Sequence, residues 1–147
     1  MAWILTSKAS ELCQSLGFHR IGTYQNEPLD EAKYKQFLFW IIYTMDKSLS
    51  LRLGRSSTIQ DYDVTLPDPH NIEHQNPITS FFDLWVAVSR LQGQIYELLY
   101  CPAAIAQPEP VRRSRVQLLI RQLGEIDSLT CEASVRLCGY IRAVNIV

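Results

Sequence analysis

Hydrophobic residues recur every three or four positions in several stretches of the chain, which is the spacing of amphipathic helices. The first such stretch covers residues 3–17. Gly17 stands at its end, where a glycine commonly caps a helix. The predicted apolar stripe of this helix consists of Ile4, Leu5, Leu12 and Leu16.

The pattern is strongest over residues 29–53, where Asp30 and Glu31 suit the positive end of a helix and Gly54 suits its stop. One stripe consists of Tyr34, Phe37, Leu38, Ile41, Met45 and Leu49. The other side is also apolar and carries Phe39, Trp40, Ile42 and Tyr43. A helix that is apolar nearly all round needs neighbours on more than one side. We therefore expect it at the centre of the fold.

A third helix is predicted over residues 80–100, with Ser80 and Asp83 as a capping pair and Pro102 after its end. Its stripe consists of Leu84, Val88, Leu91, Ile95 and Leu98. The prolines and turn-forming residues that precede this helix predict irregular structure.

A fourth helix is predicted over residues 110–123, with Pro110 at its first position and Gly124 as its cap. Its stripe consists of Val116, Leu119, Ile120 and Leu123. The remaining residues have only a weak pattern, which allows one more short helix. No stretch alternates convincingly with the period of a strand, so we predict an all-α fold, an irregular helical bundle. We place the domain at residues 1–128 and a divergent or truncated tail at 129–147.

Composition narrows the classes of function. The 147 residues are 47% hydrophobic and 20% charged, which is typical of one globular domain, and the net charge is −1. No global positive field would draw such a chain to DNA or to an anionic membrane. No run approaches the roughly 20 apolar residues of a membrane helix. The four cysteines lack C-x-x-C spacing, so we expect free thiols, no zinc site and an intracellular protein.

The end of the second predicted helix gathers an acid and two arginines around a glycine. A lone buried carboxylate at Asp46 would be costly unless it were paired. We therefore predict that Arg52 or Arg55 folds back to Asp46 and fixes how the chain leaves the helix at Leu53 and Gly54. The alternative is a solvated surface trio, since exposed ion pairs contribute little.

Four blocks in this order resemble the fungal-specific transcription factor domain, the middle homology region found downstream of six-cysteine binuclear zinc clusters. The blocks are "ASELCQSLGFHR" (9–20), "FLFWIIYTMDKSLSLRLGR" (37–55), "TIQDYDVTLP" (58–67) and "LQGQIYELLY" (91–100). Asp46 and the Leu-Gly-Arg turn at 53–55 fall on that family's motif. Ser56 follows the turn, where the family often has proline.

The resemblance implies a nuclear, all-helical regulator of transcription. Its region is usually much longer than this chain, so the chain looks like a piece of a larger helical domain with an exposed apolar patch. No cofactor is expected here, and zinc only if an upstream cluster exists. DNA would then be a partner only indirectly, through an attached or partner zinc cluster. A homodimer or heterodimer is possible, and no membrane is expected.

Other candidate residues have a functional and a structural interpretation. The aromatic residues Trp40, Tyr43, Phe81 and Trp85 could line a small-molecule pocket, although core packing is favoured. His70 and His74 have H-x3-H spacing but lie among prolines, where solvated loop histidines are favoured over a metal site. The arginine cluster at 112–115 could contact phosphates, but a solvated helix face is favoured.

Three functions compete. The first is a regulatory domain that controls an attached or partner DNA-binding unit. The second is a free-standing interaction or ligand-sensing module that pairs with full-length relatives. The third is a helical enzyme, which we do not expect, because no nucleophile–base pair, phosphate loop or set of metal ligands supports it.

Overall fold

The computed structural model describes residues 1–69 and 77–144, although the side chains at 77–81, 133 and 136–144 are not described. Within these ranges the regular structure is helical, which confirms the all-α prediction. The helices are α1 (Ala2–Ser15), η1 (Ile21–Tyr24), α2 (Leu29–Arg52), η2 (Asp61–Asp63), α3 (Pro77–Ile95), the π-turn η4 (Tyr96–Tyr100), α4 (Pro102–Ile105) and α5 (Glu109–Val144). None of the described helices is long and apolar enough to cross a membrane.

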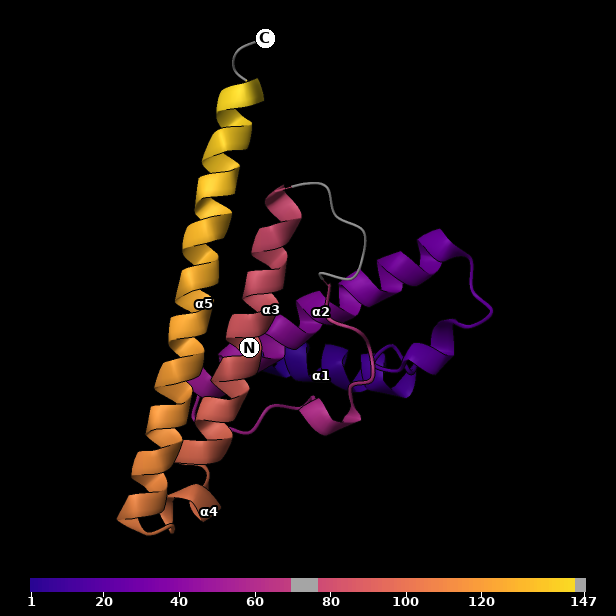
Figure 1. Ribbon diagram of the computed structural model, residues 1–147. Coiled ribbons are helices and arrows are strands. Elements are labelled where there is room, and N and C mark those ends of the chain that lie inside the picture. Colours follow the sequence, from indigo (N-terminus) through magenta and orange to yellow (C-terminus); the bar gives the residue numbers. More distant parts are fainter. Residues whose placement is uncertain (70–76, 145–147) are drawn as a thin grey trace.

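Helix α2 lies between α1 and α3, and α5 packs along α3 (Figure 1). The chain runs down α3 and returns along α5, so these two helices are antiparallel and side by side. The central position predicted for the second helix is therefore confirmed.

The predicted helix ends at Gly17 and Gly54 are both confirmed. Gly17 and Gly54 have φ angles of 76° and 64°, in the left-handed region that suits glycine. The amide of Phe18 donates to the carbonyl of Cys13, and the amide of Arg55 donates to that of Ser50, both at 2.9 Å. These bonds close α1 and α2 as Schellman motifs.

The predicted stop at Gly124 is wrong, because α5 continues through it to Val144. Gly124 does not adopt a positive φ. A glycine inside a helix costs only about 1 kcal/mol relative to alanine, which does not end a helix whose neighbours favour it. Helix α3 also differs from its prediction, since it begins at Pro77 rather than at Ser80.

The buried face of α1 is the opposite of the predicted one. The predicted stripe, which comprises Ile4, Leu5, Leu12 and Leu16, is exposed. Ser7, Ser10 and Cys13 are buried instead; Cys13 belongs to the core, and Ser7 Oγ accepts a hydrogen bond from Thr58 Oγ1 at 3.3 Å. Small side chains let two helix backbones approach closely, and that contact decides which side of α1 is covered.

In α2 the second of the two apolar sides forms the core. Phe39, Trp40 and Tyr43 are fully buried and contact one another through their rings, whereas Tyr34 and Met45 are exposed. The core is completed by Cys13, Tyr24, Ala32, Ile59, Leu66 and Val86. These residues come from α1, η1, α2, α3 and the segment that follows α2.

Candidate functional site

The C-terminal half of α2 buries two adjacent charged side chains, Asp46 and Lys47, each 0% exposed. Because successive residues of a helix point about 100° apart, these two charges reach different partners. Both side chains bind residues of the segment that follows Gly54.

Asp46 binds a backbone amide and not an arginine. Its Oδ2 atom accepts a hydrogen bond from the amide of Ile59 at 2.9 Å. Among the described residues no salt bridge joins Asp46 to Arg52 or Arg55, so the predicted pairing is wrong. Arg52 comes six residues later and points roughly 240° around the helix from Asp46. The guanidinium of Arg55 lies 4.5 Å from the ring centroid of Trp3 instead.

Lys47 has three polar partners in the same segment. Its Nζ donates to the carbonyl of Ile59 at 2.9 Å and to Ser57 Oγ at 3.0 Å, and it pairs with Asp61 Oδ1 at 2.8 Å. A buried ammonium needs such a full set of partners, because desolvation of an isolated charge is costly. Sequence reasoning missed Lys47, since its partners are remote from any helical spacing.

Two further contacts surround Lys47. The hydroxyl of Tyr43 donates to the same Asp61 oxygen at 2.8 Å. Burial, followed by the charge of Asp61, raises the pKa of Tyr43 far above its ordinary value, so the phenol stays protonated and remains a donor. On α3, Gly93 lies against the lysine stem, and a Cβ atom there would stand 3.0 Å from Lys47 Cδ.

The far end of the segment is tied to α3. Arg90 forms a two-pronged pair with the carboxylate of Asp68, with distances of 2.7 and 3.1 Å. The hydrogen bonds that Arg90 donates to Asp68 are the main reason that the pKa of Arg90 is raised further. The segment 57–68 is thus held by buried charges on α2 and by an arginine on α3, which is a structural role.

The predicted aromatic set does not form one pocket. Trp40 and Tyr43 belong to the core, as the favoured interpretation held. Trp85 is 66% exposed, and the side chain of Phe81 lies outside the described residues, as do His70 and His74. Among the described residues no group of three or more His, Cys, Asp or Glu side chains could hold a metal ion.

Trp85 instead lines an open groove of about 460 Å³ between α2 and α3. The groove combines apolar side chains with hydroxyl groups, one amide and the guanidinium of Arg52. It is lined by Ile41, Thr44, Met45, Ser48, Arg52, Phe82, Trp85, Val88, Ser89 and Gln92. Apolar surfaces that contain a few polar groups are typical of sites that bind a protein segment or a small molecule.

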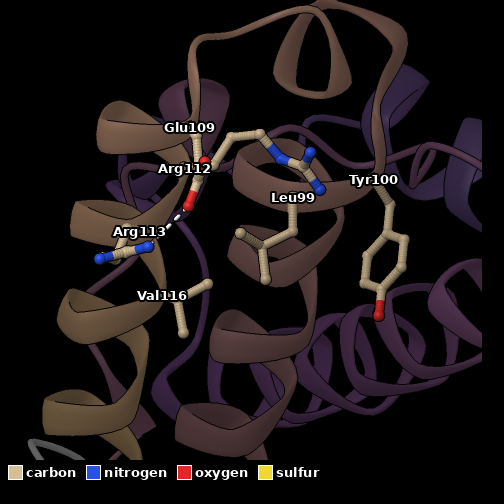
Figure 2. Close-up of a pocket in the computed structure, with 6 residues that line it drawn as sticks. All are labelled: Leu99, Tyr100, Glu109, Arg112, Arg113 and Val116. Carbon is tan, nitrogen blue, oxygen red and sulfur yellow. Dashed lines mark hydrogen bonds and ion pairs between the residues drawn. The ribbon is translucent and has the colours of Figure 1, made fainter.

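A second hollow, of about 370 Å³, lies where η4 meets the start of α5 (Figure 2). Leu99 and Val116 form its apolar part, beside Tyr100, Arg112 and Arg113. Arg113 pairs with Glu109 at 2.6 Å, and this exposed pair spans one helical turn. The predicted arginine cluster is divided, because Arg115 turns away and donates to the carbonyl of Leu98 at 3.2 Å.

Comparison with protein families identifies the fungal specific transcription factor domain over residues 1–126. The chain belongs to this family. The matched residues include α1 to α4 and the buried charges of α2. They also include the groove between α2 and α3 and the hollow beside η4. The resemblance seen in the sequence is therefore confirmed.

The relatives of this fungal transcription factor domain are named as regulators of transcription. Two are called ABC-transporter-regulating transcription factor: one from Aspergillus fumigatus is 26% identical over 86% of this chain, and one from Aspergillus oryzae is 28% identical over 84%. A third, from Candida glabrata, is called negative regulator of pleiotropic drug resistance STB5 and is 24% identical over 97% of the chain. The chain spans only 14–15% of the length of these relatives. No solved structure matches it.

Proposed function

We propose that this fungal transcription factor domain is a regulatory module that controls transcription in the nucleus through contacts with other protein segments. The observation that carries the proposal is the family match over residues 1–126, together with relatives that are named as transcriptional regulators. Family membership also favours a regulator over an enzyme.

In this proposal, DNA is contacted only through a separate six-cysteine zinc cluster, attached or on a partner chain. The charge balance supports this division, since a net charge of −1 gives the chain no global positive field that would draw it to DNA. The chain itself needs no cofactor, and zinc belongs to the cluster. The open apolar groove between α2 and α3 is the surface best suited to receive a regulatory partner.

A tethering experiment tests the regulatory role. The chain is fused to an unrelated DNA-binding domain in a yeast that carries a matching reporter gene. We expect reporter output to change severalfold relative to the DNA-binding domain alone. The variant Trp85→Gln, which alters the groove at an exposed side chain, should reduce the change, whereas Leu118→Gln on α5 should not. A folded, nuclear fusion that leaves the reporter unaffected would contradict the proposal.

The second candidate function is a free-standing module that pairs with full-length relatives or senses a small apolar molecule. The same groove favours it, because its walls combine apolar side chains with hydroxyl and amide groups. Titration of the labelled chain with the purified Aspergillus fumigatus relative, followed by fluorescence anisotropy, tests the pairing. Saturable binding that Trp85→Gln weakens would support it, and no binding at any accessible concentration would exclude it.

A further inference from the structure

Helices α2 and α3 run in the same direction along the groove between them. The rings of Phe37 and Phe82 contact each other, with 4.9 Å between their centroids. Further along both helices, a Cβ atom at Gly93 would stand 3.0 Å from Cδ of Lys47. Because the order of these contacts is the same in both helices, early positions of α2 lie beside early positions of α3.

The groove changes from apolar to polar in that direction. Its first part is lined by Ile41 and Trp85, and its last part by Ser48, Gln92 and Arg52. From Ile41 to Arg52 the groove follows α2 for roughly 16 Å, at 1.5 Å per residue. A ligand that lies along it would therefore have an apolar body and a polar end.

The polar end contains a hydrogen-bond acceptor without a partner. The Oε1 atom of Gln92 is buried from solvent and accepts no hydrogen bond from the described residues. The hydroxyls of Thr44 and Ser89, in contrast, donate to carbonyls of their own helices at 2.8 and 2.7 Å. Because a buried acceptor without a donor is unfavourable, a ligand with an N–H or O–H group at this point would be stabilised.

Arg52 supplies a positive charge at the same end of the groove. Its side chain is exposed, and no acidic side chain in the described part of the protein forms a salt bridge with it. The other described residues that line the groove are uncharged. The C-terminal end of a helix favours cations, so the attraction of an anion depends on the guanidinium, which pairs well with a carboxylate.

We propose that the groove binds an elongated organic anion in which an apolar chain is followed by an N–H or O–H donor and a terminal carboxylate. The chain lies against Ile41 and Trp85, the donor bonds to Gln92 Oε1, and the carboxylate pairs with Arg52. N-acyl amino acids contain these three parts in this order. The proposal rests on the second candidate function, the sensing of a small molecule, and it names the class of ligand.

The size of the groove favours a small molecule over a helix of a protein partner. Its volume is about 460 Å³, within the range of small-molecule sites. A helix about 10 Å across and 16 Å long occupies roughly 1,300 Å³, so most of it would lie outside the groove. An extended chain of the same length has only about 14 chain atoms, close to the length of N-decanoylglycine.

An NMR titration of the purified, ¹⁵N-labelled chain with N-decanoylglycine tests the binding, at concentrations below those at which the ligand forms micelles. The indole N–H signal of Trp85, assigned by its loss in Trp85→Phe, should shift and saturate, whereas the signal of the buried Trp40 should not. We expect a dissociation constant on the order of 0.1 mM, since each atom of such a ligand contributes little. A Trp85 signal that stays in place at millimolar ligand would overturn the proposal.

Two combinations of variant and ligand test the polar contacts. Arg52→Gln should weaken N-decanoylglycine by about fivefold and leave its uncharged analogue N-decanoylglycinamide unchanged. Gln92→Leu should also weaken N-decanoylglycine by about fivefold, but leave decanoate, which lacks the N–H donor, unchanged. Arg55→Gln is the matched control, because Arg55 is also exposed near the end of α2 but stacks on Trp3. Circular dichroism verifies that the variants fold, and unchanged affinity in both groove variants would overturn the proposal.

A helical peptide separates this proposal from the first proposed function. If a synthetic amphipathic helix with leucines at intervals of three and four residues shifts the Trp85 signal and none of the small molecules does, the groove receives a protein segment. That result would overturn the ligand proposal and leave the expectation for the tethered reporter intact. Saturable binding of N-decanoylglycine by a chain whose fusion leaves the reporter unaffected would support the ligand site and contradict the regulatory role.

Discussion

Asp46 and Lys47 are neighbours in sequence, and both bind backbone groups of the segment that follows α2. The Asp46 carboxylate accepts a hydrogen bond from the amide of Ile59, and the Lys47 ammonium donates one to the carbonyl of the same residue. Both backbone groups of Ile59 are thereby saturated while its side chain is fully buried. Two charges on a helix thus hold the start of a segment whose only regular structure is the short helix η2.

The first prediction concerns the acid. Asp46→Ala leaves the buried amide of Ile59 without its partner, and we expect the free energy of unfolding to fall by about 2 kcal/mol. Arg52→Ala should change the free energy of unfolding by less than about 0.5 kcal/mol, because Arg52 is exposed and does not pair with Asp46. Urea denaturation followed by circular dichroism measures both. Equal losses of unfolding free energy in the two variants would instead support the pairing of Asp46 with an arginine that the sequence predicts.

The second prediction compares two glycines inside helices. Gly93→Ala places a methyl group 3.0 Å from Cδ and 3.1 Å from Nζ of Lys47, whose three polar partners prevent it from moving freely. We expect a loss of about 1 kcal/mol or more. Gly124→Ala meets open space and should stabilise the folded monomer by about 1 kcal/mol. Thermal unfolding at low protein concentration compares them, and a stabilising Gly93→Ala would contradict the tight contact.

The third prediction concerns pH. Burial lowers the pKa of His19; neighbouring Arg20 adds to this, and Asp63 opposes it. The unfolded chain therefore takes up a proton near pH 6.5 while folded His19 does not, so acidification favours unfolding. Stability due to this group is full above pH 6.5 and falls as the pH approaches the lower pKa of the folded state. His19→Gln should flatten this part of the stability profile, and an unchanged slope would contradict it.

At the scale of elements, α1 reverses the usual relation between hydrophobicity and burial. Its leucines and Ile4 are exposed, whereas its buried side chains include Ser7 and Ser10. The apolar stripe of α1 therefore lies on the surface of the domain, while small side chains form the buried face of the helix.

The fourth prediction tests this reversal. Ser10→Leu adds a large side chain at a position that is 0% exposed, and the overpacking should destabilise the fold by about 2 kcal/mol. Leu12→Gln, on the exposed side of the same helix, should change stability by less than about 0.5 kcal/mol. Chemical denaturation of both variants measures the difference. A larger loss for Leu12→Gln would mean that the predicted stripe is buried after all.

The sequence predicted where the helices begin and end better than it predicted which face of each helix is buried. The bounds of α2 and the stops at Gly17 and Gly54 follow from local patterns, because helix spacing and glycine caps are properties of neighbouring residues. The buried face of α1 depends on how closely α2 approaches, which no single stretch encodes. Lys47 and its partners were missed for the same reason, since Ser57, Ile59 and Asp61 meet it only after the segment folds back.

At the scale of the whole molecule, α2 and α3 each pack between two other helices, whereas α1 and α5 are covered on one side only. Helix α2 is packed between α1 and α3, whereas α5 contacts the domain through α3 and η4 (Figure 1). Apolar side chains consequently remain exposed on α1, in the groove between α2 and α3, and along α5. This distribution suits a regulatory module whose surfaces are used by other protein segments.

The fifth prediction asks whether the groove between α2 and α3 is open in solution. The dye ANS binds exposed apolar surface, and Trp85 and Met45 supply much of the exposed apolar area in this groove. The double variant Trp85→Gln, Met45→Gln should lower dye fluorescence severalfold while the unfolding midpoint shifts little, because both side chains are more than half exposed. Leu5→Gln, Leu12→Gln on α1 is the matched control for dye bound elsewhere. If the control removed the signal and the groove variant did not, α1 would be the principal apolar surface, and the regulatory partner would have to be sought there.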